Sequence, residues 1–283
     1  ANLFINAKTS SEVLFCLAHE TIGDDMGQSS IGSMYLHSDE EAIGWGEIYP
    51  SNPLLYLYER YSMDTRYTAF IHPQYPGLDT YTIYFPDPET ENDDSGRLNL
   101  TANGTFDADE NFVFTYDGAT YKAEKRLING EYYEYHVNYK GVDCLARVHK
   151  TMKNRNTSPI YYMSKFSYQD GKAMISSPII CRWAEVILNR AEAYAHMGGK
   201  DAEALADVNV LRTRAGIPAD GLFAAGKMHG YKTALDVVLD ERRLELAFEG
   251  FRTHDLTRNK LDIDRRFPGA HPWQVVPYNH DHL

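Results

Sequence analysis

The apolar residues in the first part of the chain follow the period of β-strands. In the segment Ser11 to Ala18, the alternate residues Val13, Phe15 and Leu17 fall on one side, which predicts a half-buried strand. A second strand is predicted over Thr80 to Phe85, where the sequence is TYTIYF. Between these two strands, the apolar face of Leu54 to Tyr61 predicts a short helix.

Two signals for tight turns lie between Phe112 and Tyr139. Asp117-Gly118 and Asn129-Gly130 are each flanked by strand-forming residues. Both pairs favour the positive φ angles that two-residue hairpin turns require. We therefore expect a small antiparallel meander here that continues into Asp143 to His149.

From Pro178 onward the apolar residues follow the period of helices. One helix is predicted over Cys181 to Met197, a second over Asp201 to Ala215 and a third over Tyr231 to Glu249. Gly198-Gly199 ends the first helix, so the first two are expected to form a helical hairpin. The stripe of the first helix that is expected to face the core consists of Trp183, Ile187, Ala191 and Tyr194.

These elements define the expected fold class: mostly α with irregular loops and a small antiparallel β meander, hence α+β. A chain of 283 residues with 43% hydrophobic residues is long enough to bury a substantial core. We expect residues 1–177 to form an irregular and β-rich region that faces a ligand, and residues 178–283 to form a helical region. Both regions are expected to belong to a single compact unit.

The segment from His19 to Pro53 sustains no helical or strand period and is rich in aromatic residues. Irregular segments of this length are usually functional, so Tyr35, Trp45 and Tyr49 are candidates for binding a ligand. Trp45 lies between two glycines, which leaves the faces of its ring open. An alternative of equal weight is that Trp45 packs the loop onto the core.

Tyrosine is unusually common, with 21 residues in the chain. Its ring can stack on a sugar while its hydroxyl forms hydrogen bonds, which suits a wet binding surface. The alternative is a tyrosine-rich β region that packs on itself. Tyr132, Tyr133 and Tyr135 are weaker candidates for binding because cross-strand packing explains them.

The charge pattern excludes some classes of partner. A net charge of −12 without a Lys/Arg stripe argues against binding of nucleic acid or of an anionic membrane surface. No apolar run approaches the roughly 18 residues of a membrane-spanning helix. The three cysteines, Cys16, Cys144 and Cys181, lie far apart in apolar surroundings, so we expect buried free thiols.

Acidic side chains are numerous, yet their spacing favours structural roles. Glu241, Glu245 and Glu249 recur at four-residue intervals beside several arginines, which is typical of salt bridges. A glycosidase would require two facing carboxylates, and the sequence does not establish such a pair. A hydrolase therefore remains only a minor alternative, and we expect no enzymatic activity.

Metal sites are not expected either. Asp107, Asp109 and Asn111 alternate like the ligands of a calcium loop, but Phe112 stands where such a turn needs glycine, so a solvated turn is the better interpretation. The pair His280 and His282 flanks Asp281 at the end of the sequence, which is weak support for a metal. No fingerprint of a phosphate, dinucleotide or other cofactor site is present.

The helical part resembles the C-terminal signature of the SusD/RagB family. The strings RWAEVILNRAEAYAHMGG, DVNVLRTRAGI and LDVVLDERRLELAFEGFRTHDLTR have the order and spacing of that signature, and weaker similarity extends over Ser11 to Lys260. The residues that fall on the pattern are Arg182, Glu185, Glu192, Asn209, Arg212, Arg214, Gly216, Glu241, Arg242, Glu245, Glu249, Gly250, Arg252, Asp255 and Arg258. We expect these charged residues to be architectural, pairing with one another and with loop carbonyls.

The resemblance implies a non-catalytic lipoprotein on the extracellular face of the outer membrane. Such a protein captures oligosaccharides, or in some members peptides, for a SusC-like TonB-dependent transporter, and contacts the membrane through a lipid anchor. By this resemblance, we expect most of the family's tetratricopeptide-like helical half, its lipidated cysteine and its usual closing segment to lie outside the sequence given. Two alternatives remain: capture of a peptide or another nutrient, and a scaffold that binds a protein through the hairpin from Trp183 to Ala215.

Overall fold

The structure is a computed structural model that describes most of the chain. It covers residues 2–21, 23–24, 31–36, 44–73, 80–90, 98–150, 154–155, 158–173, 175–269 and 271–278. The chain divides into two compact units whose segments alternate along the sequence. Unit 1 consists of residues 1–50, 54–72 and 161–255, and unit 2 of residues 51–53, 73–160 and 256–283.

Among the described residues, the α-helices and the β-strands contain similar numbers of residues. The helices are α1 (Asn2–Ile5), α2 (Ile31–Tyr35), α3 (Asn52–Glu59), α4 (Thr65–Phe70), α5 (Trp183–His196), α6 (Asp201–Arg214), α7 (Ala234–Glu245) and α8 (Arg252–Arg258). The strands are β1 (Val13–Cys16), β2 (Ile71–Pro73), β3 (Tyr81–Pro86), β4 (Asn99–Phe106), β5 (Phe112–Tyr116), β6 (Ala119–Ile128), β7 (Tyr132–Tyr139), β8 (Val142–Lys150), β9 (Asn154–Arg155), β10 (Ser158–Pro159), β11 (Tyr161–Met163), β12 (Ile179–Arg182), β13 (Ile263–Asp264) and β14 (Val275–Val276).

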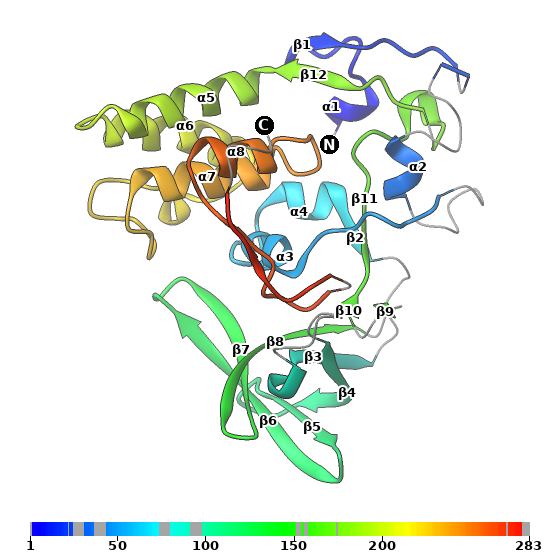
Figure 1. Ribbon diagram of the computed structural model, residues 1–283, viewed down its shortest axis with the longest axis vertical. Coiled ribbons are helices and arrows are strands. Elements are labelled where there is room, and N and C mark those ends of the chain that lie inside the picture. Colours follow the sequence, from blue (N-terminus) through cyan, green and yellow to red (C-terminus); the bar gives the residue numbers. More distant parts are fainter. Residues whose placement is uncertain are drawn as a thin grey trace. The chain divides into compact units, whose positions relative to one another are not determined.

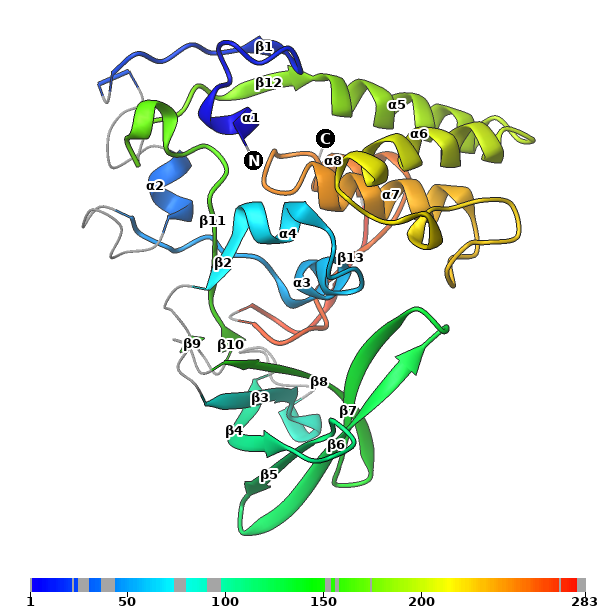
Figure 2. The same cartoon turned by 180° about the vertical axis from the view of Figure 1, so that it is seen from behind.

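Three helices form the core of unit 1. Figures 1 and 2 show α5, α6 and α7 side by side, and α5 and α6 form the predicted helical hairpin. The side of α6 that faces the core carries Ala204, Val208 and Leu211, which are all buried. Ala204 and Val208 pack with Ala191 of α5 and Val238 of α7 in one apolar cluster. Leu211 belongs to a second cluster, together with Leu188 of α5.

The predicted inward stripe of α5 is wrong at its first position. Trp183 is 50% exposed, whereas the neighbouring Ala184 and Leu188 are fully buried. Apolar residues lie on both sides of the true core line of this helix, so periodicity alone does not fix its phase. The start predicted for α7 is also early, because Thr233 caps the helix and forms a capping box with Asp236.

Unit 2 is built on a closed antiparallel barrel with the strand order β3-β4-β5-β6-β7-β8. The first and last strands pair with each other, with Ile83 opposite Val148, and this pairing closes the barrel. Alternate side chains point inward and form an apolar cluster that includes Phe85, Phe112 and Phe114. In Figure 1 the β6–β7 hairpin is the longest arm of this unit.

The predicted meander is thus one part of a larger sheet, and the emphasis on a mostly α fold is not confirmed. The α+β class itself is correct. Sequence analysis missed β4, whose sequence NLTANGTF has low strand propensity. Its register nevertheless requires a glycine, because a Cβ at Gly104 would overlap the carbonyl oxygen of Val113 on the neighbouring strand.

The barrel accounts for many of the tyrosines. Tyr81, Tyr116, Tyr121 and Tyr135 pack against the barrel core, and the ring of buried Tyr139 lies 5.4 Å from that of Phe85. The interpretation of a tyrosine-rich β region that packs on itself is therefore confirmed for these residues. Both predicted hairpin turns are also confirmed, because Asp117, Gly118, Asn129 and Gly130 all have positive φ angles.

The first predicted strand forms, but its burial differs from the prediction. Strand β1 pairs with β12 in a two-stranded antiparallel sheet, with Phe15 opposite Cys181. Phe15 is 61% exposed and Leu17 is 56% exposed, so the side expected to be half-buried is open. All three cysteines are free, and Cys144 is buried as expected, whereas Cys16 and Cys181 are partly exposed.

Candidate binding site

The aromatic segment of unit 1 is held against α2 by backbone hydrogen bonds. The backbone nitrogen of Trp45 donates to the Ser33 oxygen at 2.7 Å, and those of Glu47 and Ile48 donate to the Met34 oxygen. Both flanking glycines are buried, while the Trp45 side chain is 54% exposed. A fixed backbone therefore presents a largely open indole ring.

The other two predicted residues lie close to Trp45 in the chain but differ in exposure. Tyr35 is half-buried, and its ring meets that of Phe248 edge to face at a centroid distance of 5.1 Å. Burial raises the pKa of the Tyr35 phenol, so the group stays neutral and able to donate a hydrogen bond. Tyr49 is partly exposed. Residues 22, 25–30 and 37–43 of the irregular segment lie outside the described residues.

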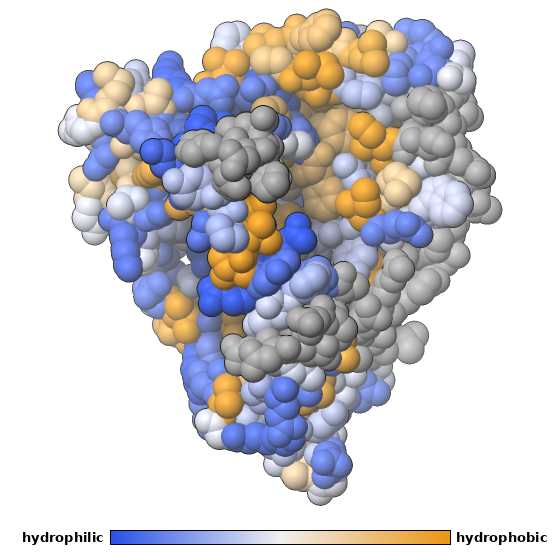
Figure 3. Space-filling view, in the orientation of Figure 1, coloured by the Kyte–Doolittle hydropathy of each residue, from blue (hydrophilic) through white to orange (hydrophobic). Residues whose placement is uncertain are grey.

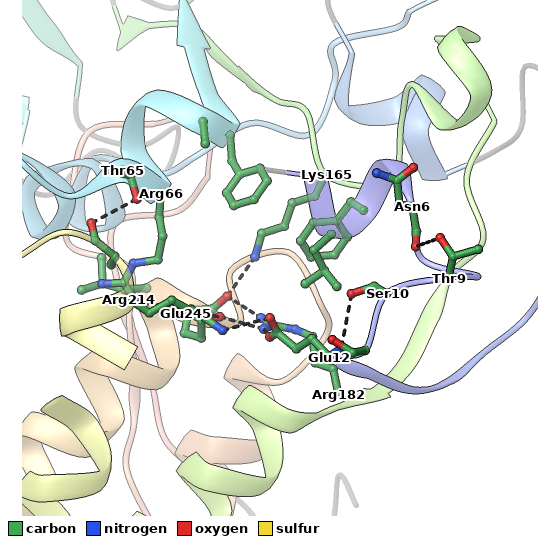
Figure 4. Close-up of a pocket in the computed structure, with 17 residues that line it drawn as sticks. Asn6, Thr9, Ser10, Glu12, Thr65, Arg66, Lys165, Arg182, Arg214 and Glu245 are labelled. Carbon is green, nitrogen blue, oxygen red and sulfur yellow. Dashed lines mark hydrogen bonds and ion pairs between the residues drawn. The ribbon is translucent and has the colours of Figure 1, made fainter. Parts of the chain in front are cut away.

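A second feature of unit 1 is a cavity of about 540 Å³. Its walls come from α1, α4 and the residues around β1, α6 and α7. Polar groups of Asn6, Thr9 and Ser10 lie on one side of it (Figure 4), and Phe4 and Phe70 also line the cavity. This volume lies within the range of small-molecule sites.

The floor of the cavity is a network of buried ion pairs. Figure 4 shows Arg66, Lys165, Arg182 and Arg214 converging on Glu245. The Glu245 carboxylate accepts from Arg182 at 2.7 Å, from Arg214 at 2.5 Å and from Arg66 at 3.1 Å. The prediction that the signature charges pair with one another is confirmed for these residues.

The same side chains complete the C-terminus of α7. A helix leaves its last carbonyl groups without partners in the helix. Lys165 Nζ donates to the Glu245 and Ala247 oxygens at 2.9 and 3.0 Å, and Arg182 donates to the Glu245 oxygen at 2.9 Å. Cations are favoured at this end of a helix because of its dipole. The signature residues thus anchor distant segments to the end of α7.

The electrostatics of the network favour a structural role over acid-base chemistry. Burial alone would raise the pKa of the Glu245 carboxyl, but the guanidinium groups of Arg182, Arg66 and Arg214 hold that pKa well below its usual range. Burial is also the largest cause that lowers the pKa of Lys165, although Glu249 opposes it. Glu245 therefore stays ionised and engaged by its partners at neutral pH.

One isosteric substitution tests the capping of α7. The Tyr58 hydroxyl donates to the Leu244 oxygen at 2.6 Å, and Tyr58 is 1% exposed. Tyr58→Phe leaves that buried carbonyl oxygen without its donor, so we expect the free energy of unfolding to fall by about 1–3 kcal/mol. Urea denaturation measures this fall in the free energy of unfolding. Tyr133→Phe is the control, because the side chain of Tyr133 is 58% exposed. An unchanged midpoint for Tyr58→Phe would contradict the argument.

The first of the candidate metal sites from the sequence is a hydrogen-bonded turn. Asp107 Oδ1 accepts from the backbone nitrogens of Asp109 and Asn111 at 3.0 and 2.9 Å, so these residues form the predicted turn. Within the described ranges, no group of three His, Cys, Asp or Glu side chains is placed to hold a metal ion. The terminal His280, Asp281 and His282 lie outside those ranges. No described helix is long and apolar enough to cross a membrane.

Sequence analysis missed an exposed apolar surface on unit 1. We call it the β1–β12 surface; it consists of Leu14, Phe15, Leu17, Ile180, Trp183 and Val186. In Figure 3 apolar side chains gather where Figure 1 places β1 and β12. Both strands are rich in apolar residues, but the sequence does not show which of these side chains the core covers.

The sequence pattern of the SusD family matches residues 11–282, which is nearly the whole chain. The chain belongs to the SusD family. The SusD-like protein P2 of Formosa agariphila is 30% identical to this chain over 126 residues, which are 44% of this chain and 25% of that protein. The matched part therefore spans about a quarter of that relative.

Parts of this chain are also similar to solved structures of SusD-like proteins. A SusD superfamily protein from Bacteroides thetaiotaomicron is 28% identical, with a TM-score of 0.36, over 44% of this chain and 27% of that one. A SusD-like protein from Bacteroides fragilis covers 98% of this chain and 50% of its own length at 18% identity, with a TM-score of 0.46.

Proposed function

We propose that this SusD-family chain is part of a non-catalytic protein that captures oligosaccharides at the cell surface. Membership of a family of carbohydrate-binding proteins for nutrient capture supports this role. The proposal includes delivery to a SusC-like TonB-dependent transporter, a lipid anchor and a location on the outer face of the outer membrane. Capture of a peptide instead of a glycan is the alternative.

The observation that carries the proposal is the exposure of Trp45 on a backbone fixed to α2. Aromatic faces bind sugar rings by stacking, and a pre-organised ring loses little conformational freedom on binding. The cavity is a weaker candidate for stacking, because Lys165 Nζ already lies 5.1 Å from the Phe4 ring centroid and 5.4 Å from that of Phe70.

The test is a titration with a panel of neutral oligosaccharides, followed by tryptophan fluorescence. We expect saturable binding that Trp45→Ala weakens about tenfold or more, since truncation of an aromatic anchor in a binding site commonly removes about 2 kcal/mol or more. Trp183→Ala is the matched control, because Trp183 is equally exposed, at 50%. Equal losses in the two variants, or no loss in Trp45→Ala, would argue against Trp45 as the stacking residue.

The β1–β12 surface favours a second candidate, a scaffold that binds another protein. It contains Trp183 and Val186, which begin the α5–α6 hairpin, and Phe15, the most exposed of its residues. Exposed apolar patches of this kind often mark protein contacts. Retained binding to a transporter without any glycan binding would favour the scaffold.

A further inference from the structure

The cavity of unit 1 contains hydrogen-bonding groups that the fold does not use. Figure 4 shows Asn6, Thr9 and Ser10 along one side of this cavity, and Ser11 also lines it. The Asn6 amide and the Ser11 hydroxyl form no hydrogen bond with the described residues. The Ser10 hydroxyl accepts from the backbone nitrogen of Glu12 at 3.3 Å, so its own proton is available to a ligand. This side of the cavity therefore offers both donors and acceptors, and these groups are uncharged.

Arg214 adds further unused donors to the lining. Its Nη1 atom pairs with Glu12 at 3.0 Å, and its Nη2 atom donates to Glu245 at 2.5 Å. The Nε–H group and the second N–H of each Nη atom have no partner among the described residues. The Arg214 side chain is 43% exposed, so a ligand that enters the cavity can reach these groups.

The charged groups around the cavity compensate one another. The cations of this network are Arg66, Lys165, Arg182, Arg212 and Arg214. An equal number of carboxylates pairs with them, from Glu12, Asp64, Glu241, Glu245 and Glu249. A ligand carboxylate at Arg214 would lie beside Glu12 and Glu245, and a ligand ammonium group at Glu12 would lie beside Arg182. Because like charges repel each other, the cavity favours a neutral ligand.

The apolar lining and the volume limit the shape of that ligand. The apolar residues of the lining are Leu3, Phe4, Ala69, Phe70, Ala215 and Leu244. Lys165 Nζ lies over the Phe4 and Phe70 rings, so a ligand meets aliphatic surface here and not an open aromatic face. A volume of about 540 Å³ suits a small molecule such as a disaccharide.

We propose that this cavity is a second binding site, which takes a short neutral sugar through hydrogen bonds and without aromatic stacking. Each sugar hydroxyl both donates and accepts, which matches the unused groups of Asn6, Ser11 and Arg214. The C–H groups of the sugar ring pack on the aliphatic part of the lining. The neutral, hydroxyl-rich class of ligand follows from the cavity, whereas the choice of a sugar within that class rests on the proposed function.

The test uses neutral disaccharides and charged derivatives of two of them. Maltose, cellobiose, lactose and mannobiose are each titrated by calorimetry into the wild-type chain and into Trp45→Ala. Sodium maltobionate and sodium lactobionate are the charged counterparts of maltose and lactose. Titration into Trp45→Ala separates the cavity from the stacking site, because Trp45 does not line the cavity.

Two variants change the unused groups of the cavity. Asn6→Ala removes a side-chain amide without a partner, so its thermal midpoint should equal that of the wild-type protein. Arg214→Lys keeps the positive charge but removes the planar group that carries the unused donors. Arg190→Lys is the matched control, because Arg190 pairs with Asp207 and does not line the cavity.

We expect saturable binding of at least one of these disaccharides, with equal affinity in the wild-type chain, Trp45→Ala and Arg190→Lys. Asn6→Ala and Arg214→Lys should each weaken it about threefold or more, the loss expected when a hydrogen bond to a ligand is removed. Absent binding of every disaccharide, unchanged affinity in either site variant, or loss of binding in Trp45→Ala would overturn the cavity site.

The remaining outcomes separate the class of ligand from the proposed function. An acid form that binds as tightly as its neutral parent would overturn the neutral class. Longer oligosaccharides that bind at Trp45 while no disaccharide binds in the cavity would overturn this inference and leave the proposed function intact. Disaccharide binding that Asn6→Ala weakens and Trp45→Ala does not would support the cavity even if the stacking role of Trp45 fails its own test.

Discussion

Glu245→Gln is expected to lower the free energy of unfolding by about 3–5 kcal/mol, because it leaves buried cations without their shared anion. Glu245 is 4% exposed and binds Arg182, Arg66 and Arg214. Glutamine keeps the size of the side chain, so the loss reports the charge. Chemical denaturation at pH 7 measures the effect.

A second readout is the pH dependence of the difference in free energy of unfolding between the wild-type protein and Glu245→Gln. The folded state holds the pKa of Glu245 well below its ordinary value of 4.5. A lowered pKa in the folded state gives stability that is fully present above the unfolded value and is lost as pH falls below it. The gap between the wild-type protein and Glu245→Gln should therefore narrow below about pH 4.5. A gap that is constant with pH would show that packing, and not charge, causes the loss.

An ion pair on the surface provides the control for the Glu245→Gln substitution. Glu203 pairs with Lys200 near the start of α6, and both side chains are more than 40% exposed. Glu203→Gln is expected to leave the denaturation midpoint nearly unchanged, because water already screens such pairs. Equal effects of Glu203→Gln and Glu245→Gln would contradict the role given to burial.

Phe85→Ala is expected to destabilise the barrel of unit 2 by about 3–5 kcal/mol, the range for truncating a buried phenylalanine. Phe85 is fully buried, and its ring lies 5.6 Å from Phe114 and 5.4 Å from Tyr139. The substitution opens a cavity where strands β3, β5 and β7 meet inside the barrel. Because closure depends on this core, the amides of β3 to β8 should lose protection together.

Hydrogen exchange followed by mass spectrometry measures this effect strand by strand, which suits a chain of two units. Tyr133→Ala is the control, since Tyr133 belongs to β7 but is 58% exposed. Protection of the barrel amides should fall steeply in Phe85→Ala and little in Tyr133→Ala. Unchanged protection in Phe85→Ala would show that the barrel does not depend on this ring.

The candidate site was predictable only in part. Glycines on both sides of Trp45 indicated an open ring, and the structure gives that ring a fixed backbone. The half-burial of Tyr35 against Phe248 was not predictable, because these residues lie more than two hundred positions apart and no local signal links them.

The sequence by itself determined the elements whose signals are local. Turn residues located the β5–β6 and β6–β7 hairpins, glycine ended α5, and the three signature strings established the family. These features depend on backbone angles and side chains within a few residues of one another.

Only the tertiary structure decided closure of the barrel, the exposed side of β1 and the partners of each charge. Closure joins β3 to β8 across more than fifty residues, and Glu245 meets Arg66 and Arg182 from distant segments. Hydrophobic periodicity gives the repeat of an element but not the surface that covers it. Likewise, a charged residue shows its sign in the sequence, whereas its burial and its partner exist only after the chain has folded.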